Sequence, residues 1–280
     1  SLGLQAEYEK DLYYSPYKRI SSMPVLYSSP EGIYVYEGMG RDHLRLFGHD
    51  GVYEKTIYPF PASQIKKVNG LNWVKAPDGH EVVEKESVYK QTMLTSGDND
   101  GPYGPFGKGK EGAGVTGFAV KGKRIALAFE NINRITTNGS SGELPLKGPK
   151  TGYVIKKFSG GNDQLIGPTS MAFSPDGKIV YLTGYLWQQS HGANSGSLQA
   201  VFKINYEANE EMSVFAGFNS EKDYGSDETH FAIPTSVETD QTGNVYVSDF
   251  ANNRVQIFDP AGKLLKSLSV INPAKVLVHQ

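Results

Sequence analysis

A repeated pattern of short β-runs and turns is the feature that most constrains the fold of this 280-residue chain. Pro234-Thr-Ser begins an alternating run to Asp240, Gly243 supplies a turn, and a second run ends at Asp249. Pro168-Thr-Ser begins the same pattern upstream, and Gly177 follows it at the spacing that separates Pro234 from Gly243. Because self-similarity of this kind indicates stacked copies of one structural unit, the chain is predicted to be a repeat protein.

Further copies extend the pattern. One begins at Pro24 and includes residues 43–51, which align with residues 254–262. A weaker copy spans residues 115–139, and its predicted alignment places Asn133-Arg134 on Asn253-Arg254. Another copy begins at Asn272-Pro273. Each unit supplies up to four short strands separated by turns, which is the composition of a propeller blade. A single blade cannot bury both of its faces, so the units must pack against one another around an axis.

The unit at residues 234–262 resembles the NHL repeat, through Asn252-Asn253-Arg254-Val255-Gln256 and the Gly residues that flank it. The resemblance implies an all-β fold, a β-propeller of four-stranded antiparallel blades. We expect five or six blades, or an incomplete part of a longer chain. Residues 1–280 are expected to form a single domain, with an inserted hairpin and a Gly-rich loop at about residues 63–114. We also expect residues 4–19 to pair beside residues 275–279 and complete the last blade.

The composition favours β-strands and excludes several classes of function. The 32 glycines and 17 tyrosines favour tight turns and pleated surfaces. A net charge of −2 gives no basic surface for nucleic acid, and no apolar run is long enough to span a membrane. The absence of cysteine excludes disulfides and thiolate chemistry. We expect a bacterial protein located in the periplasm or outside the cell.

The first candidate site is a carbohydrate platform. Trp187, Gln188 and His191 lie in a long polar segment after the second strand of the 168-unit, and His230 lies in the next long loop. An aromatic face can stack on a sugar ring while amide and imidazole groups bind its hydroxyls. The alternative is a surface loop whose tryptophan packs on a neighbouring blade.

The second candidate site is a metal centre in the loop before Pro234. Asp223, Asp227, Glu228 and His230 would supply carboxylate oxygens and one imidazole, which suits Ca²⁺ or Zn²⁺. The alternative is a solvated acidic loop, because the spacing matches no specific ligand motif.

Other chemical motifs are weaker. The segment 95–114 contains Gly107, Gly109 and Gly112, but Glu111 follows Lys110 where a phosphate-binding loop needs Ser or Thr. The sequence also lacks the nucleophile elbow of serine hydrolases.

We therefore expect a non-catalytic binding or scaffold propeller that recognises a glycan, a peptide or a protein partner. The alternatives are a metal-assisted lyase or hydrolase at the axial mouth, and one module of a larger protein. Arg254 is expected to pair within or between blades as a structural residue.

Overall fold

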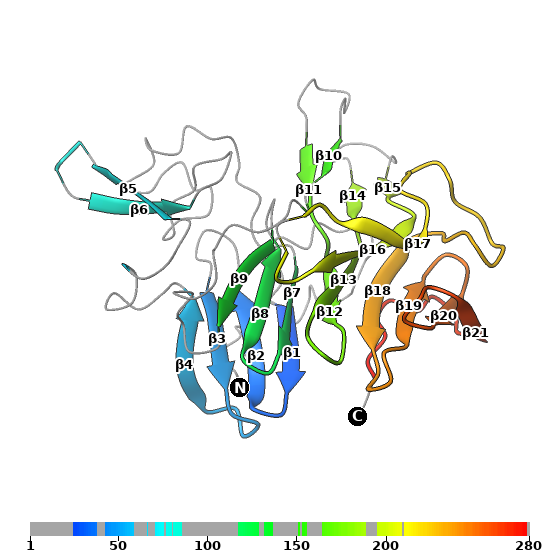
Figure 1. The fold of residues 1–280 in the computed structure, drawn as a ribbon, viewed down its shortest axis with the longest axis horizontal. Coiled ribbons are helices and arrows are strands. Elements are labelled where there is room, and N and C mark those ends of the chain that lie inside the picture. Colours follow the sequence, from blue (N-terminus) through cyan, green and yellow to red (C-terminus); the bar gives the residue numbers. More distant parts are fainter. Residues whose placement is uncertain are drawn as a thin grey trace.

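The computed structural model describes residues 25–37, 43–58, 66, 71–75, 77–79, 81–85, 117–128, 132–136, 151, 153–155, 164–188, 195–208 and 210–278. Within these ranges the regular elements are strands, and no α-helix occurs (Figure 1). Accordingly, no helix in these ranges is long and apolar enough to cross a bilayer. The all-β prediction is confirmed.

In the part of the chain that the structure describes, four antiparallel sheets form blades, which we number in chain order. Blade 1 contains β1 (Val25–Ser29), β2 (Gly32–Glu37), β3 (His43–Phe47) and β4 (Tyr53–Tyr58). Blade 2 contains β7 (Gly117–Lys121), β8 (Arg124–Ala128) and β9 (Ile132–Thr136). Blade 3 contains β12 (Ser170–Phe173), β13 (Ile179–Thr183), β16 (Ala200–Asn205) and β17 (Ser213–Gly217). Blade 4 contains β18 (Pro234–Thr239), β19 (Val245–Asp249), β20 (Arg254–Phe258) and β21 (Leu264–Ser269).

The first strands of the blades lie side by side in chain order, β1 next to β7, β7 next to β12 and β12 next to β18 (Figure 1). Each hydrophobic core is shared by two neighbouring blades. Phe118 and Val120 of β7 pack with blade 1, whereas Ala119 between them packs with blade 3. This alternation follows from the period of two along a strand. The chain is therefore a β-propeller whose blades depend on one another for burial.

Asp and Gly set the hairpin turns that the sequence predicts. Between β18 and β19, an Asp240 carboxylate oxygen accepts hydrogen bonds from the backbone N–H groups of Thr242 and Asn244, both at 2.9 Å. Gly243 follows with a φ of 89°, a conformation that glycine adopts without steric cost. The turn between β20 and β21 repeats this arrangement with Asp259.

Three two-stranded hairpins accompany the blades within the described ranges: β5 (Leu71–Lys75) with β6 (Glu81–Lys85), β10 (Tyr153–Ile155) with β11 (Gln164–Ile166), and β14 (Leu186–Gln188) with β15 (Ser195–Ser197). The first hairpin lies within residues 63–114, where the sequence predicts an inserted hairpin, and Leu71 pairs with Lys85 across it. The third lies between the second and third strands of blade 3.

The segment after blade 4 repeats a backbone contact that joins the first strands of blades 3 and 4. In blade 4, the Val237 backbone N–H donates to Ser170 Oγ of blade 3 at 3.0 Å. The Val276 backbone N–H donates in the same way to Ser236 Oγ at 3.2 Å, and Val276 follows Pro273 as Val237 follows Pro234. This contact agrees with the repeat start predicted at Asn272-Pro273, but residues 271–278 form no strand, so a further blade stays a prediction. The pairing expected for residues 4–19 lies outside the described residues.

The alignment predicted for Asn133-Arg134 is wrong. Arg254 is the first residue of β20 and pairs with Asp249, whereas Arg134 is the third residue of β9 and pairs with Ala126. The connection into β9 is shorter than that into β20, so Arg134 occupies the blade position of Gln256. There its Nη1 donates to the Tyr206 backbone carbonyl of blade 3 at 3.0 Å.

Candidate functional site

The connector 218–233 joins β17 of blade 3 to β18 of blade 4 and carries the residues predicted for the metal centre. Most of its side chains are exposed, and its two ends are fixed by Gln199, which is buried. The Phe218 backbone N–H donates to the Gln199 carbonyl at 2.9 Å. The Ile233 backbone N–H donates to Gln199 Oε1, also at 2.9 Å. The connector therefore starts and ends at one buried residue, whose backbone carbonyl binds the first end and whose side chain binds the second.

Ile233 shows that this anchoring holds the backbone in a strained state. Its φ is 64°, in the left-handed region that β-branched residues rarely adopt. Besides its bond to Gln199, its carbonyl accepts a hydrogen bond from the Phe250 backbone N–H at 3.1 Å. Such strain persists only where surrounding contacts determine the conformation.

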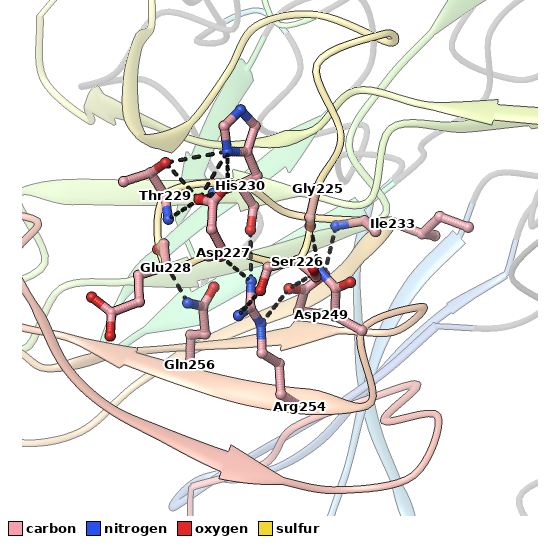
Figure 2. A network of polar contacts seen from close by, with 12 residues as sticks. Gly225, Ser226, Asp227, Glu228, Thr229, His230, Ile233, Asp249, Arg254 and Gln256 are labelled. Atoms are coloured by element: carbon pink, nitrogen blue, oxygen red, sulfur yellow. Dashed lines mark hydrogen bonds and ion pairs between the residues drawn. The ribbon is translucent and has the colours of Figure 1, made fainter.

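Arg254 supports the connector from the side of blade 4 (Figure 2). Its Nε donates to Asp249 Oδ2 at 2.8 Å, and its Nη1 donates to the Ser226 carbonyl at 2.8 Å. Its Nη2 donates to the carbonyls of Asp227 and His230, both at 2.7 Å. One guanidinium thus fixes three backbone carbonyls of the connector, and the prediction that Arg254 is a structural residue is confirmed.

Asp249 is the counter-ion of Arg254 and is fully buried. Its Oδ1 accepts a hydrogen bond from the Ala232 backbone N–H at 2.7 Å, and its Oδ2 accepts one from Asn252 Nδ2 at 2.8 Å. Burial raises the pKa of Asp249, against the opposing effect of these donors. Asn252 also donates to the Gly225 carbonyl at 2.7 Å. We call Asp249, Asn252 and Arg254 the clamp.

Asp227 and His230 form a hydrogen-bonded pair on the exposed side of the connector. His230 Nδ1 lies 2.8 Å from Asp227 Oδ2, and Asp227 Oδ1 accepts from Thr229 N and Oγ1 at 2.9 and 2.8 Å. The hydrogen bonds from His230 and then Thr229 hold the pKa of Asp227 well below its usual range. A proton on Nδ1 leaves the lone pair of a neutral imidazole on Nε2. Figure 2 shows Nε2 pointing away from the network.

Phe218, an aromatic residue that the sequence patterns did not indicate, lies beside His230, and a second such residue, Tyr224, lies in the same connector. The Phe218 ring stacks on the imidazole with a centroid distance of 4.5 Å and an interplanar angle of 26°. Phe218 is 39% exposed and Tyr224 is 69% exposed. Gly225, which follows Tyr224, lies against His230, since a Cβ there would come within 3.0 Å of the His230 Cβ. We call Phe218, Tyr224 and His230 the aromatic platform.

The residues of the predicted metal centre are only partly brought together. Asp227 and His230 are in contact, whereas the Glu228 carboxylate points away from the imidazole (Figure 2). In the part of the chain that the structure describes, no three His, Asp or Glu side chains are grouped to hold a metal ion. The metal centre stays a prediction.

The predicted carbohydrate platform around Trp187 also stays a prediction. Trp187 and Gln188 lie on β14, opposite Gly196 and Ser195 of β15. His191 lies outside the described residues, as does the Gly-rich segment 95–114. Of the residues predicted for that site, the side chain of His230 is the one the structure places.

Comparisons with known proteins agree with the repeat. The NHL repeat matches residues 231–258. Among solved structures, the chain is similar to a gluconolactonase from Xanthomonas campestris, with 15% identity over 91% of this chain and 78% of that chain and a TM-score of 0.36. It is also similar to regucalcin, a calcium-binding protein from Agrobacterium tumefaciens, with 12% identity over 89% and 74% of the two chains and a TM-score of 0.33. An auxiliary nutrient binding protein from Bacteroides ovatus shows 12% identity over 88% of this chain and 57% of its own, with a TM-score of 0.40.

The matched segment begins at the end of the connector and runs to the end of β20, so it includes the whole clamp. These structural similarities are too distant to assign an activity. The match to the NHL repeat therefore covers the end of the connector, the clamp and the first three strands of blade 4.

Proposed function

We propose that the protein is a non-catalytic binding propeller that recognises a glycan on the aromatic platform. The observation that supports this proposal is the fixed orientation of His230, which Asp227 holds through Nδ1 and Phe218 holds by stacking. A ligand would meet an imidazole that has already lost much of its rotational freedom. Such preorganisation lowers the entropic cost of binding.

The chemistry of the platform suits a sugar ring. The exposed faces of Phe218 and Tyr224 can pack against the apolar C–H face of a pyranose. His230 Nε2 can accept a hydrogen bond from a ring hydroxyl. A glycan is a ligand that presents both groups within one ring. We propose further that the protein meets this ligand as an exported bacterial protein, which fractionation of the native cells tests.

A glycan array with matched variants tests the proposal. We expect Phe218→Ala and Tyr224→Ala each to weaken binding about tenfold, because the loss of one aromatic contact is worth about 0.5–1.5 kcal/mol or more. Tyr53→Ala is the control, since Tyr53 is an exposed aromatic residue of blade 1. An array without any bound glycan, or equal losses in all three variants, would contradict the proposal. A bound peptide or protein partner in place of a glycan would do the same.

A second candidate function, a metal-assisted lyase or hydrolase, is favoured by the Asp227–His230 pair. A carboxylate that accepts a hydrogen bond from Nδ1 orients the imidazole and makes Nε2 a better metal ligand. If this function holds, titration calorimetry with Zn²⁺ or Ca²⁺ gives stoichiometric binding that His230→Ala abolishes. Binding that His230→Ala leaves unchanged would exclude His230 as the ligand.

A further inference from the structure

The stacked pair of the aromatic platform is assembled from two ends of the connector that different blades hold. Phe218 follows β17 of blade 3, and its backbone N–H donates to the Gln199 carbonyl at 2.9 Å. His230 lies near the other end, where Arg254 of blade 4 donates to its carbonyl at 2.7 Å. The stacking of the two rings therefore depends on how these two ends are held relative to each other.

Gln199 is hydrogen-bonded to both ends. It is a buried residue between β15 and β16 of the blade 3 region. Its backbone N–H donates to the Ser220 carbonyl at 3.1 Å, near the start of the connector, and its Oε1 accepts from the Ile233 N–H at 2.9 Å, at the end. Its Nε2 donates to the Ser197 carbonyl of β15, also at 2.9 Å. Because both groups of the buried amide are paired, the orientation of the side chain is fixed.

The bond to Ile233 supports a costly backbone conformation. The carbonyls of Ala232 and Ile233 accept hydrogen bonds from the N–H groups of Ala251 and Phe250, which follow β19 of blade 4. Blade 4 thus holds the carbonyl of Ile233, whereas Gln199 holds its N–H. A β-branched residue before proline prefers an extended backbone, yet the φ of Ile233 is 64°. Such a conformation persists because contacts on both sides determine it.

We infer that Gln199 is a positioning residue of the aromatic platform. Its side chain ties the His230 end of the connector to blade 3, where Phe218 is held, and so keeps the two rings stacked. This inference deepens the proposed function, and its consequence for glycan binding rests on that function. Since Gln199 is buried, it acts through the two rings and not by contact with a ligand. Without its amide, Ile233 can return toward an extended backbone, and the stack loosens.

NMR spectroscopy tests the inference without a ligand. The carbon-bound ring protons of His230 report the stack, because the Phe218 ring lies against the imidazole at a centroid distance of 4.5 Å and shields them. Phe218→Ala gives the positions of these signals without the shielding ring. Gln199→Met keeps the length of the side chain and removes both amide groups, and we expect it to move the signals in the same direction.

Gln256→Met is the matched control for this change. Gln256 is also fully buried and also bonds to the connector, but its Nε2 donates to the Glu228 carbonyl in the middle of the connector, at 3.3 Å. The control should leave the His230 signals in place. Urea unfolding measures the stability of both variants. If both lose stability and neither moves the His230 signals, Gln199 has only a structural role and the inference is overturned.

Gln199→Glu is a more conservative second variant. It keeps an oxygen acceptor for the Ile233 N–H and loses the amide donor to Ser197. Its His230 signals should stay near those of the unchanged protein, which would show that the bond to Ile233 positions the platform. A displacement as large as that in Phe218→Ala would overturn the inference, also where Gln199→Met does not fold.

The glycan array supplies the arm that depends on the proposed function. Gln199→Met should weaken the binding of retained glycans about tenfold, because a loosened platform must be ordered again on binding. Displaced His230 signals with unchanged glycan affinity would overturn the role of the stack in binding. Unmoved signals would overturn the inference and leave glycan binding in place. An array without any bound glycan would overturn the proposed function, whereas the NMR result would still decide whether Gln199 positions the rings.

Discussion

At the scale of single residues, the clamp shows how a buried ion pair can be satisfied. Asp249 is fully buried, and its two oxygens accept three hydrogen bonds from separate donors. The Arg254 side chain is 13% exposed, and its remaining N–H groups donate hydrogen bonds to backbone carbonyls of the connector. A buried pair of this kind adds little net stability, yet removal of one partner leaves the other charge unpaired.

Arg254→Ala should therefore lower the free energy of unfolding by about 3–5 kcal/mol, because it leaves the Asp249 carboxylate buried without its counter-ion. Arg254→Lys should lower the free energy of unfolding by a smaller amount, since an ammonium keeps the positive charge but cannot form the same set of hydrogen bonds. Urea unfolding measures both. Lys266→Ala on the exposed strand β21 is the control and should change stability by less than ~0.5 kcal/mol. Equal stability of Arg254→Ala and the unchanged protein would contradict a supporting role.

Asp227 gives a prediction about pH. Its pKa is lower in the folded protein than in the unfolded chain, so its contribution to stability is present above the ordinary carboxylate range and is lost as the pH falls below about 4. Asp227→Asn should remove this part of the acid dependence. Unfolding curves at a series of acidic pH values compare the two proteins. An unchanged acid profile in Asp227→Asn would show that the pairing with His230 does not contribute.

At the scale of elements, the sequence predicts blade 4 well and the connector poorly. Asp and Gly residues mark the turns of this blade, and the residues between the turns alternate with a period of two. Together these signals predict the ends of β18 to β21 to within about one residue. The predicted alignment of Arg134 is wrong because an Asn-Arg pair does not fix the register of a strand when the connection before it differs in length. Phe218 and Tyr224 were missed because aromatic residues in a loop follow no period. A sequence signal was present, since both lie among polar and charged residues.

Glycine positions at element ends give a matched pair of predictions. Gly217, the last residue of β17, has a φ of 78°, and a Cβ there would lie 2.3 Å from the Gln199 carbonyl oxygen. Gly79, between β5 and β6, has a φ of 91° with no atom within 4 Å of such a Cβ. Gly79→Ala should cost about 1–2 kcal/mol of stability from backbone strain alone. Gly217→Ala should cost clearly more stability than Gly79→Ala. Urea unfolding of both variants checks which one loses more. Equal losses would mean that the contact with Gln199 is easily relieved.

At the scale of the whole molecule, stability is shared along the row of blades. Every core cluster within the described ranges joins two neighbouring blades, so no blade is buried by its own residues alone. The repetition of the unit predicted this shared burial, because a single blade cannot bury both of its faces. The number of blades and the closure of the ring stay predictions.

The serine contacts between first strands provide a test at this scale. Ser236→Ala removes the acceptor of the Val276 backbone N–H and should speed hydrogen exchange at Val276 and its neighbours. Ser170→Ala should act in the same way on Val237, since this contact joins blade 3 to blade 4. Because Val237 is buried, we expect a smaller change there than at Val276. Unchanged exchange at Val276 would show that this contact does not hold the segment.

The clamp also bears on how this surface can change during evolution. Asn252 and Arg254 bind backbone carbonyls of the connector, and every residue type supplies a backbone carbonyl. The shape of the connector is therefore largely independent of its exposed side chains. Glu221, Asp223, Tyr224 and Glu228 can be replaced together while the loop keeps its path. Blade 4 thus provides a scaffold on which new specificities can arise, or be selected from a randomised library, without renewed cost to folding.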